Sequence, residues 1–365
     1  MQKQRPGKVL LRRWLIVLSL MLAVNLLLVF ADHPQAVEKY YSKGFYPFIC
    51  HVLHPVFNLF PFSVGDLIYL FVIGYLVYAL IRLIVLCIKK KFMHAGIFAA
   101  GIVIAVMAGI LMFYSFWGLN YFRPSAGERL NLRDSTYTKA ELQRVTTILI
   151  DSANAARARV TAADLKQGND SIYSIANKAV IKLSNTNAQY YTYSPKIKPS
   201  LLTGLLNYIG TSGYYNPFTG EAQMNYQMPV FNRPFVASHE MSHQMGYGPE
   251  DEANFVGFIA AIGSNDRLLR YSAYNLAVNE FMHTVRYTDT VVFKQLKIKI
   301  SPQVLADFKE ERLYWLSYQN KINTITSVFY DNFLKANNQP QGLDTYNRMV
   351  LLVLATYKGK KVASR

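Results

Sequence analysis

Three long apolar runs in the first third of the chain constrain its fold more than any other feature. The first run is apolar apart from Ser19 and Asn25, and the second is interrupted only by Arg82 near its end. A helix needs about 20 apolar residues to cross the hydrocarbon core of a bilayer. We therefore predict three membrane-spanning helices, with the lipid bilayer as a partner, rather than buried helices of a soluble core. The runs are Leu15–Ala31, Leu67–Ile88 and Ala95–Trp117.

The first run also has features of a cleavable signal peptide. Arg12 and Arg13 precede it, and Val29-Phe30-Ala31 at its end resembles a cleavage site. The apolar stretch is longer than a typical signal core, which favours an uncleaved anchor. Under either interpretation the segment that follows is exported.

Basic residues in the short flanks predict the orientation. Lysine and arginine cluster before the first run, and Lys89, Lys90 and Lys91 separate the second run from the third. The loop between the first two runs, residues 32–66, has only Lys39 and Lys43. Because positive loops stay in the cytoplasm, we predict a multi-pass protein of the inner cell membrane. Its N-terminus is cytoplasmic, and everything after Asn120 is extracytoplasmic, that is, periplasmic.

The rest of the chain has the composition of one globular domain, so we expect a membrane part over 1–120 and a soluble domain over 121–365. Helical periodicity fades between residues 190 and 231, where tyrosine, glycine, proline and asparagine dominate and Pro217–Gly220 signals a turn. We expect short strands there, including Glu221–Val230. The fold class is thus three membrane helices followed by a mostly α-helical α+β domain. The expected helices are Thr138–Ala158, Ser171–Leu183, Pro234–Met245, Glu250–Ile262, Arg267–Tyr287, Pro302–Leu334 and Thr345–Tyr357.

The formal net charge of +17 does not indicate nucleic-acid binding. Basic residues are spread along the soluble part or clustered at the ends of the apolar runs, and no basic stripe with interleaved aromatic residues occurs. The two cysteines, Cys50 and Cys87, are expected near opposite membrane faces, so we predict no disulfide between them.

Residues 239–243 read His-Glu-Met-Ser-His and carry the strongest chemical signal. On a helix, His239 and His243 lie on one face and are able to hold one metal ion. Glu240 is rotated away from that face, where it is able to take a proton from a water molecule in the open coordination position. We therefore predict a catalytic Zn²⁺ site with Glu240 as the general base.

A catalytic zinc ion usually has three protein ligands, and the third is expected just downstream. Glu250, Ala253, Asn254 and Gly257 form one helical stripe whose small residues allow a second helix to come close. We predict Glu250 as the third ligand and Asn254 as a hydrogen-bond partner of a ligating histidine. Glu252, on a different face, is the alternative ligand.

These residues resemble the gluzincin arrangement of thermolysin-type peptidases, in which a second helix supplies a glutamate and, four residues later, an aspartate. Asn254 departs from that aspartate. The whole chain also resembles an uncharacterised bacterial multi-pass membrane family, a domain of unknown function. The resemblance rests on the three spans, Pro217–Ala222 and Glu250–Phe255. It implies a zincin-like domain with peptidase activity and names no substrate.

The leading functional hypothesis is a membrane-anchored zinc metallopeptidase acting on a peptide or protein. A zinc amidase acting on cell-wall peptide uses the same chemistry, and a non-catalytic scaffold or regulator with a structural zinc site remains a third reading. The motif's polar flanks, including Asn225, Arg233 and Asp251, argue against an intramembrane protease. The sequence identifies neither the substrate nor the oligomeric state.

Several weaker candidates accompany the motif. Tyr214, Tyr215, Tyr247 and Tyr271 are able to donate a hydrogen bond to an oxyanion, although tyrosine is abundant in this chain. The strand Glu221–Val230 either pairs with an extended substrate or packs on the metal-binding helix. His283 is more typical of an ordinary core or surface residue than of a ligand.

The orientation yields the first prediction. A reporter enzyme that is active only after export should be active when fused after Asn120 and inactive when fused at Lys90, because of the positive-inside rule. Activity in whole cells, normalised to the amount of fusion protein, is the measurement. The reverse pattern would place the domain in the cytoplasm.

Overall fold

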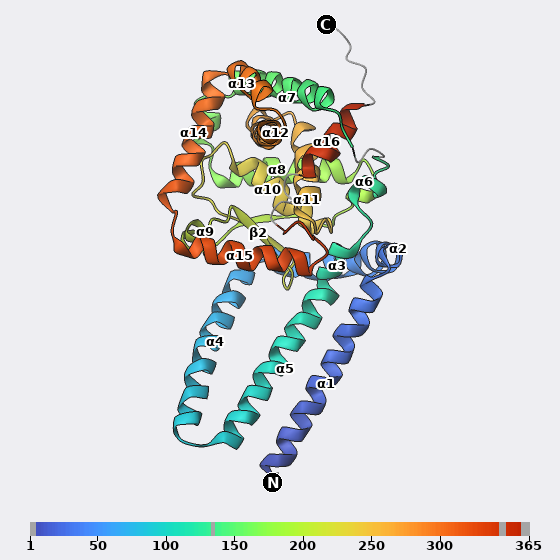
Figure 1. The fold of residues 1–365 in the computed structure, drawn as a ribbon, viewed down its shortest axis with the longest axis vertical. Coiled ribbons are helices and arrows are strands. Elements are labelled where there is room, and N and C mark those ends of the chain that lie inside the picture. The colour runs from blue at the N-terminus through green and yellow to red at the C-terminus, as the bar shows by residue number, and fades with distance from the viewer. Residues whose placement is uncertain (1–4, 133–135, 343–347, 359–365) are drawn as a thin grey trace.

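A computed structural model describes residues 5–132, 136–342 and 348–358. Figure 1 shows three long helices that carry a helical domain at one end, with short helices between the two parts. Most described residues are helical, and the strands form a small sheet. The fold class expected from the sequence is confirmed at this level.

Three helices are long and apolar enough to cross a membrane, as the apolar runs predict. They are α1 (Pro6–Ala31), α4 (Val64–Ile88) and α5 (Phe92–Phe116). α1 and α5 pack together along their length, whereas α4 stands apart and exposes nearly all of its large side chains. Gly101 of α5 lies against Arg13 of α1, whereas Gly109 of the same helix faces open space.

The segment between the first two spans is helical, although the sequence analysis treats it as a loop. It forms α2 (Pro34–Ala36), the π-helix η1 (Val37–Phe45) and α3 (Tyr46–Asn58). These helices and η2 (Gly118–Phe122) lie between the spans and the soluble domain in Figure 1. We call this layer the collar. Val37, Tyr41, Tyr46 and Trp117 form its buried core.

The soluble domain contains a three-stranded sheet in the order β1-β3-β2. The strands are β1 (Ile197–Pro199), β2 (Gly213–Asn216) and β3 (Glu221–Met224); β3 pairs parallel with β1 and antiparallel with β2. The predicted turn Pro217–Gly220 joins β2 to β3. The Asn216 side chain accepts hydrogen bonds from two turn amides, and Gly220 takes a positive φ of 69°. The expected strand Glu221–Val230 is therefore shorter, since the chain turns after Met224.

Helices surround the sheet and form one core with it. α10 and α11 are central, α8, α12 and α16 pack on them, and α7 packs on the outer side of α12. The helices are α6 (Ala126–Arg129), α7 (Lys139–Arg159), η3 (Asp164–Lys166), α8 (Asn169–Ser184), η4 (Ala188–Tyr190), α9 (Thr203–Ile209), α10 (Arg233–Gln244), α11 (Glu250–Ile262), α12 (Arg267–Thr288), α13 (Thr290–Lys299), α14 (Pro302–Ser317), α15 (Lys321–Ala336) and α16 (Met349–Lys358).

The expectation of one helix over Pro302–Leu334 is wrong, because one helix ends at Ser317 and a second begins at Lys321. Asn320 is extended, and its side chain accepts from the amides of Ile322 and Asn323, which starts α15 in a new direction. α15 then crosses the side of the domain that faces the spans (Figure 1). The start of the last expected helix, Thr345–Tyr357, lies outside the described residues.

A buried ion pair connects the second span to the sheet. Lys198 of β1 and Glu221 of β3 are 2.6 Å apart, with side chains that are 1% and 2% exposed. Glu221 also accepts from the first amides of α4, at Val64 and Gly65. A carboxylate at a helix N-terminus interacts favourably with the helix dipole, so Glu221 joins three elements at once.

The second prediction concerns this ion pair. Glu221→Gln should lower the free energy of unfolding by about 3–5 kcal/mol, because it leaves the Lys198 ammonium buried without a counter-charge. Arg267→Ala, which removes the partly exposed pair with Asp164, is the matched control and should cost under about 1 kcal/mol. Thermal unfolding of both variants in the same detergent is the measurement, and equal shifts would contradict the anchoring role.

Candidate metal centre

The metal centre is built on α10, a helix that is buried on almost every side. Its neighbours are α8, α11, α12 and the sheet. Pro234 sits in the first turn, where its missing amide hydrogen costs nothing. Three side chains of the membrane-proximal part bind carbonyl oxygens at the C-terminal end: Tyr46 binds Gln244, Trp117 binds His243 and Arg123 binds Gly246. These three side chains thus provide hydrogen bonds to backbone carbonyls that the end of a helix leaves without partners.

The turn after α10 fixes the orientation of His243. Gly246 adopts a positive φ of 78°, which brings the carbonyl of Tyr247 back to within 2.7 Å of His243 Nδ1. A backbone carbonyl on one ring nitrogen fixes the tautomer and leaves Nε2 free to bind a metal ion. The geometry at His243 therefore suits a metal ligand.

Glu250, the first residue of α11, points at both histidines. Its Oε2 lies 3.2 Å from His239 Nε2 and 3.8 Å from His243 Nε2. Gly257 makes this possible, because a Cβ there would come within 3.1 Å of the His239 backbone. The close approach of α10 and α11 agrees with the small-residue stripe in the sequence.

Tyr330 of α15 also binds Glu250. Its hydroxyl donates to Glu250 Oε1 at 2.6 Å, on the carboxylate oxygen that does not face the histidines. Burial alone would raise the pKa of Glu250, but the two histidines and Tyr330 lower it to about 2. The carboxylate is thus held ionised and fixed in direction.

Glu252 is turned away from the histidines. It accepts from the amide of Ala126 and forms an ion pair with Arg129 at 2.5 Å. The described geometry therefore places Glu250 and not Glu252 beside His239 and His243. Asn254, one turn after Glu250, is close enough to contribute to raising the pKa of His239. His239 Nδ1 nevertheless makes no hydrogen bond among the described residues, so the supporting role of Asn254 stays a prediction.

Glu240 lies between the histidines and the sheet. Its carboxylate abuts Gly213 of β2, where a Cβ would approach Glu240 Oε1 to 2.6 Å. Only glycine leaves room for the carboxylate there. The other oxygen, Oε2, is buried and has no hydrogen-bond partner among the described residues. Burial raises the pKa of Glu240 to about 8 in the absence of a cation.

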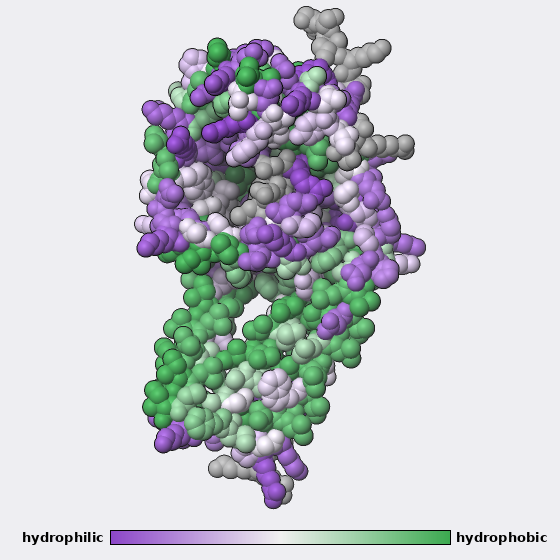
Figure 2. Space-filling model, viewed as in Figure 1, coloured by the Kyte–Doolittle hydropathy of each residue, from purple (hydrophilic) through white to green (hydrophobic). Residues whose placement is uncertain are grey.

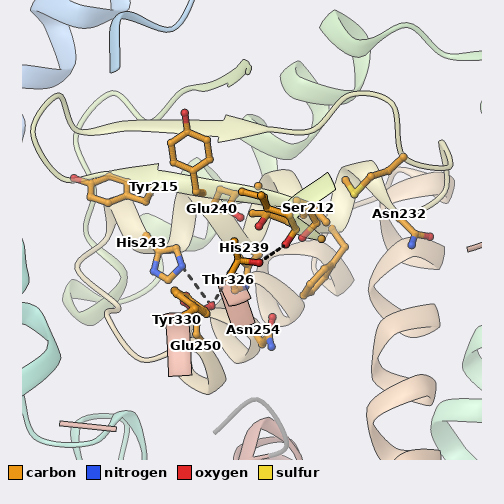
Figure 3. A pocket seen from close by; sticks show the side chains of 18 of the residues that line it. Ser212, Tyr215, Asn232, His239, Glu240, His243, Glu250, Asn254, Thr326 and Tyr330 are labelled. Atoms are coloured by element: carbon orange, nitrogen blue, oxygen red, sulfur yellow. Dashed lines mark hydrogen bonds and ion pairs between the residues drawn. The ribbon is translucent and has the colours of Figure 1, made fainter. Parts of the chain in front are cut away.

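These side chains open into a cavity of about 860 Å³. Figure 3 shows His239, His243 and Glu250 pointing toward one another, with Glu240 beneath the strand that carries Tyr215. Tyr214 and Tyr215 line this cavity, whereas Tyr247 and Tyr271 do not. Tyr247 and Tyr271 are fully buried and donate to Gln189 and Asp307 respectively. His283 is exposed and packs on Tyr287, as expected for a surface residue.

The donor set suits a zinc ion. A tetrahedral site with metal–ligand distances near 2.1 Å requires donor atoms about 3.4 Å apart. The two nitrogen–oxygen distances of 3.2 and 3.8 Å bracket that value. Within the described ranges, Glu240 also has a carboxylate oxygen within 4.8 Å of ligand atoms of His239 and His243. The printed contacts with both histidine Nε2 atoms, however, come from Glu250.

Two features of this site have no signal in the local sequence pattern. Tyr330 lies 80 residues after Glu250, so no short spacing reveals their contact. The order of the strands is the other feature: β3 is central and packs on α10, whereas β1 and β2 are both edges. A strand within Glu221–Val230 therefore has the packing role, and of the two edge strands only β2 contributes described residues to the cavity wall.

Comparison with known proteins adds a family. Residues 41–354 match the model described as a protein of unknown function (DUF3810). The chain belongs to the DUF3810 family. The DUF3810 match includes most of the collar, two spans and the whole metal centre, in agreement with the resemblance to an uncharacterised membrane family. No curated protein and no solved structure matches the chain.

The third prediction separates the two glutamates. Glu250→Ala should reduce bound zinc at least about tenfold, because it removes a donor next to both histidines. Glu252→Ala is the matched control on the same helix and should retain zinc, although loss of the Arg129 ion pair lowers its stability. The measurement is the metal content of the purified full-length variants, determined by mass spectrometry. Zinc loss from Glu252→Ala alone would reverse the assignment.

Proposed function

We propose that this chain is a membrane-anchored zinc metallopeptidase, in which His239, His243 and Glu250 hold the metal and Glu240 is the general base. The observation that carries the proposal is the carboxylate of Glu240. It is buried, has an unpartnered oxygen, and lies in a cavity between the three donors and an edge strand. Leaving such a group unpaired is costly, and a purely structural metal site has no use for it.

The shape of the cavity favours a peptide as substrate. β2 pairs with β3 on one side, and no other strand borders it within the described residues. Residues of β2 line the cavity directly above Glu240. An extended peptide is able to add to such an edge through backbone hydrogen bonds, which would place a peptide bond over the site.

Each residue has a distinct role in this proposal. Zinc, when bound, would polarise the scissile carbonyl and lower the pKa of a water molecule. Glu240 takes the proton of that water and passes it to the leaving amine. Tyr330 and the Tyr247 carbonyl hold Glu250 and His243 in place. Tyr214 and Tyr215 lie on the strand nearest the reacting bond.

The fourth prediction tests the general base. Glu240→Gln keeps the shape of the side chain and removes its basic oxygen, so hydrolysis should fall by roughly 10²–10⁴-fold while zinc remains bound. His239→Ala should lose both metal and activity. The measurement is cleavage of a peptide and protein mixture by the full-length protein in detergent, with fragments identified by mass spectrometry.

Glu311→Gln, at another part of the cavity wall, is a matched control for removing a cavity carboxylate and should remain active within about tenfold. Full activity in Glu240→Gln would refute the general-base role. Stoichiometric zinc without hydrolysis of peptides, proteins or cell-wall peptide would favour a scaffold or regulator, and release of cell-wall peptide alone would favour an amidase.

A further inference from the structure

The cavity at the metal centre has walls that belong to the membrane spans. Tyr69 of α4 and Phe113 of α5 line it together with His239 and Glu240. Tyr69 lies five residues after the start of α4 at Val64, which corresponds to about 7 Å along the helix. The cavity therefore reaches the ends of α4 and α5 that adjoin the soluble domain.

The proposed metal ligands also lie near the end of α5 that adjoins the soluble domain. Trp117 directly follows the last residue of α5, and its ring centroid is 5.7 Å from that of His243. Tyr69 contacts Tyr214 of the edge strand with centroids 6.0 Å apart. A bond cleaved at this site would lie within a few residues of the membrane surface.

α15 separates the cavity from the bilayer. One face of this helix lines the cavity through Thr326, Tyr330 and Phe333. Away from the cavity, the helix exposes Ile322, Ile325 and Val328, which are between 51% and 69% exposed. Because α15 crosses the span-facing side of the domain (Figure 1), this apolar face continues the apolar surface of the spans, as an interfacial helix does.

A lateral opening leads from the bilayer toward the cavity. Figure 2 shows an opening between α4 and α5 just below the soluble domain. On α5, Gly109 lies one turn from Phe113 on the same face, and a Cβ there would meet no atom within 4 Å. On α4, Ile73 lies one turn from Tyr69 and is 49% exposed. Both positions are therefore accessible to a helix that docks between α4 and α5.

We propose that the substrate is a membrane-anchored polypeptide whose spanning helix docks between α4 and α5 and whose adjoining segment enters the cavity from the membrane side. This inference rests on the proposed peptidase function and specifies its substrate class. A spanning helix suits the opening because small residues such as Gly109 allow close helix packing. The edge strand β2 then receives the extended segment that follows the helix. A lipid would satisfy the apolar walls but has no backbone to pair with β2.

Anchoring also explains the position of the site. A substrate held in the same bilayer has a high effective concentration at the opening. Weak contacts with the separate parts of the site are then sufficient for binding. A soluble peptide has no such advantage. The membrane-level cavity is therefore selective for anchored chains.

Cleavage of model substrates in vesicles tests the proposal. The full-length zinc-loaded protein is reconstituted in phosphatidylcholine vesicles with a peptide pool in which a spanning helix of about 20 leucine and alanine residues precedes a randomised segment. The same randomised segment without the helix is the reference. Anchored peptides should be cut at least about tenfold faster, at bonds within roughly six residues of the helix. Equal rates, or cuts spread along the segment, would overturn the proposal.

A matched pair of variants tests the route. Gly109→Leu fills the opening and should lower cleavage of the anchored pool at least about fivefold, with cleavage of the unanchored pool unchanged. Gly74→Leu is the control, because Gly74 also faces open space but lies on a different face of α4 from Tyr69. Equal effects of the two variants on the anchored pool would contradict entry between α4 and α5.

Photo-crosslinking reports docking without hydrolysis. In the Glu240→Gln background, a photoreactive residue at Ile73 should crosslink to the anchored peptide in a saturable way, and one at Phe71, exposed on the opposite face of α4, should not. Crosslinking at Ile73 with no cleavage by the wild type would remove the peptidase function but keep the docking site. Cleavage of both pools without selective crosslinking would keep the peptidase function and refute the membrane-anchored substrate.

Discussion

The structure depends on the burial of α10. A helix that carries two histidines and a glutamate among buried residues is stable only if its neighbours satisfy its polar groups. Its last carbonyls are bound by Tyr46, Trp117 and Arg123, which come from the collar and the segment after the third span. Soluble domain and membrane part are therefore joined at the helix that holds the candidate metal centre, and neither is complete without the other.

The same region concentrates buried charge. Glu250, Glu240, His239 and His243 are each nearly inaccessible to solvent. Two carboxylates this close to each other are costly unless positive charge balances them. Without an ion, Glu250 raises the pKa of His239 against the effect of burial, so a protonated His239 is able to supply this charge. A divalent cation would instead displace that proton and supply the positive charge itself, which is why the buried donor set is compatible with a metal ion.

Aromatic contacts connect the residues of the candidate metal centre to the membrane-spanning helices. Trp117 lies against both His243 and Tyr215, and Phe113 of the third span lies against Phe333 of α15. α15 in turn fixes Glu250 through Tyr330. A change in the tilt of α5 or in the depth of α15 would therefore reach His243 and Glu250 through side chains in direct contact. The position of the site at the end of the spans is a property of the whole fold.

The sequence by itself determined the elements that depend on local patterns. Apolar length specified the three spans, and the i, i+4 spacing of His239 and His243 specified one helical face. The small-residue stripe from Glu250 to Gly257 specified a close second helix. Tertiary structure decided what depends on distant contacts: the helical collar, the break before α15, the pairing of Glu252 with Arg129 and the hydrogen bond from Tyr330 to Glu250. Which strands are at the edge and which is central was also decided by the tertiary structure. Strand order is set by pairing between segments and not by the alternation within one strand.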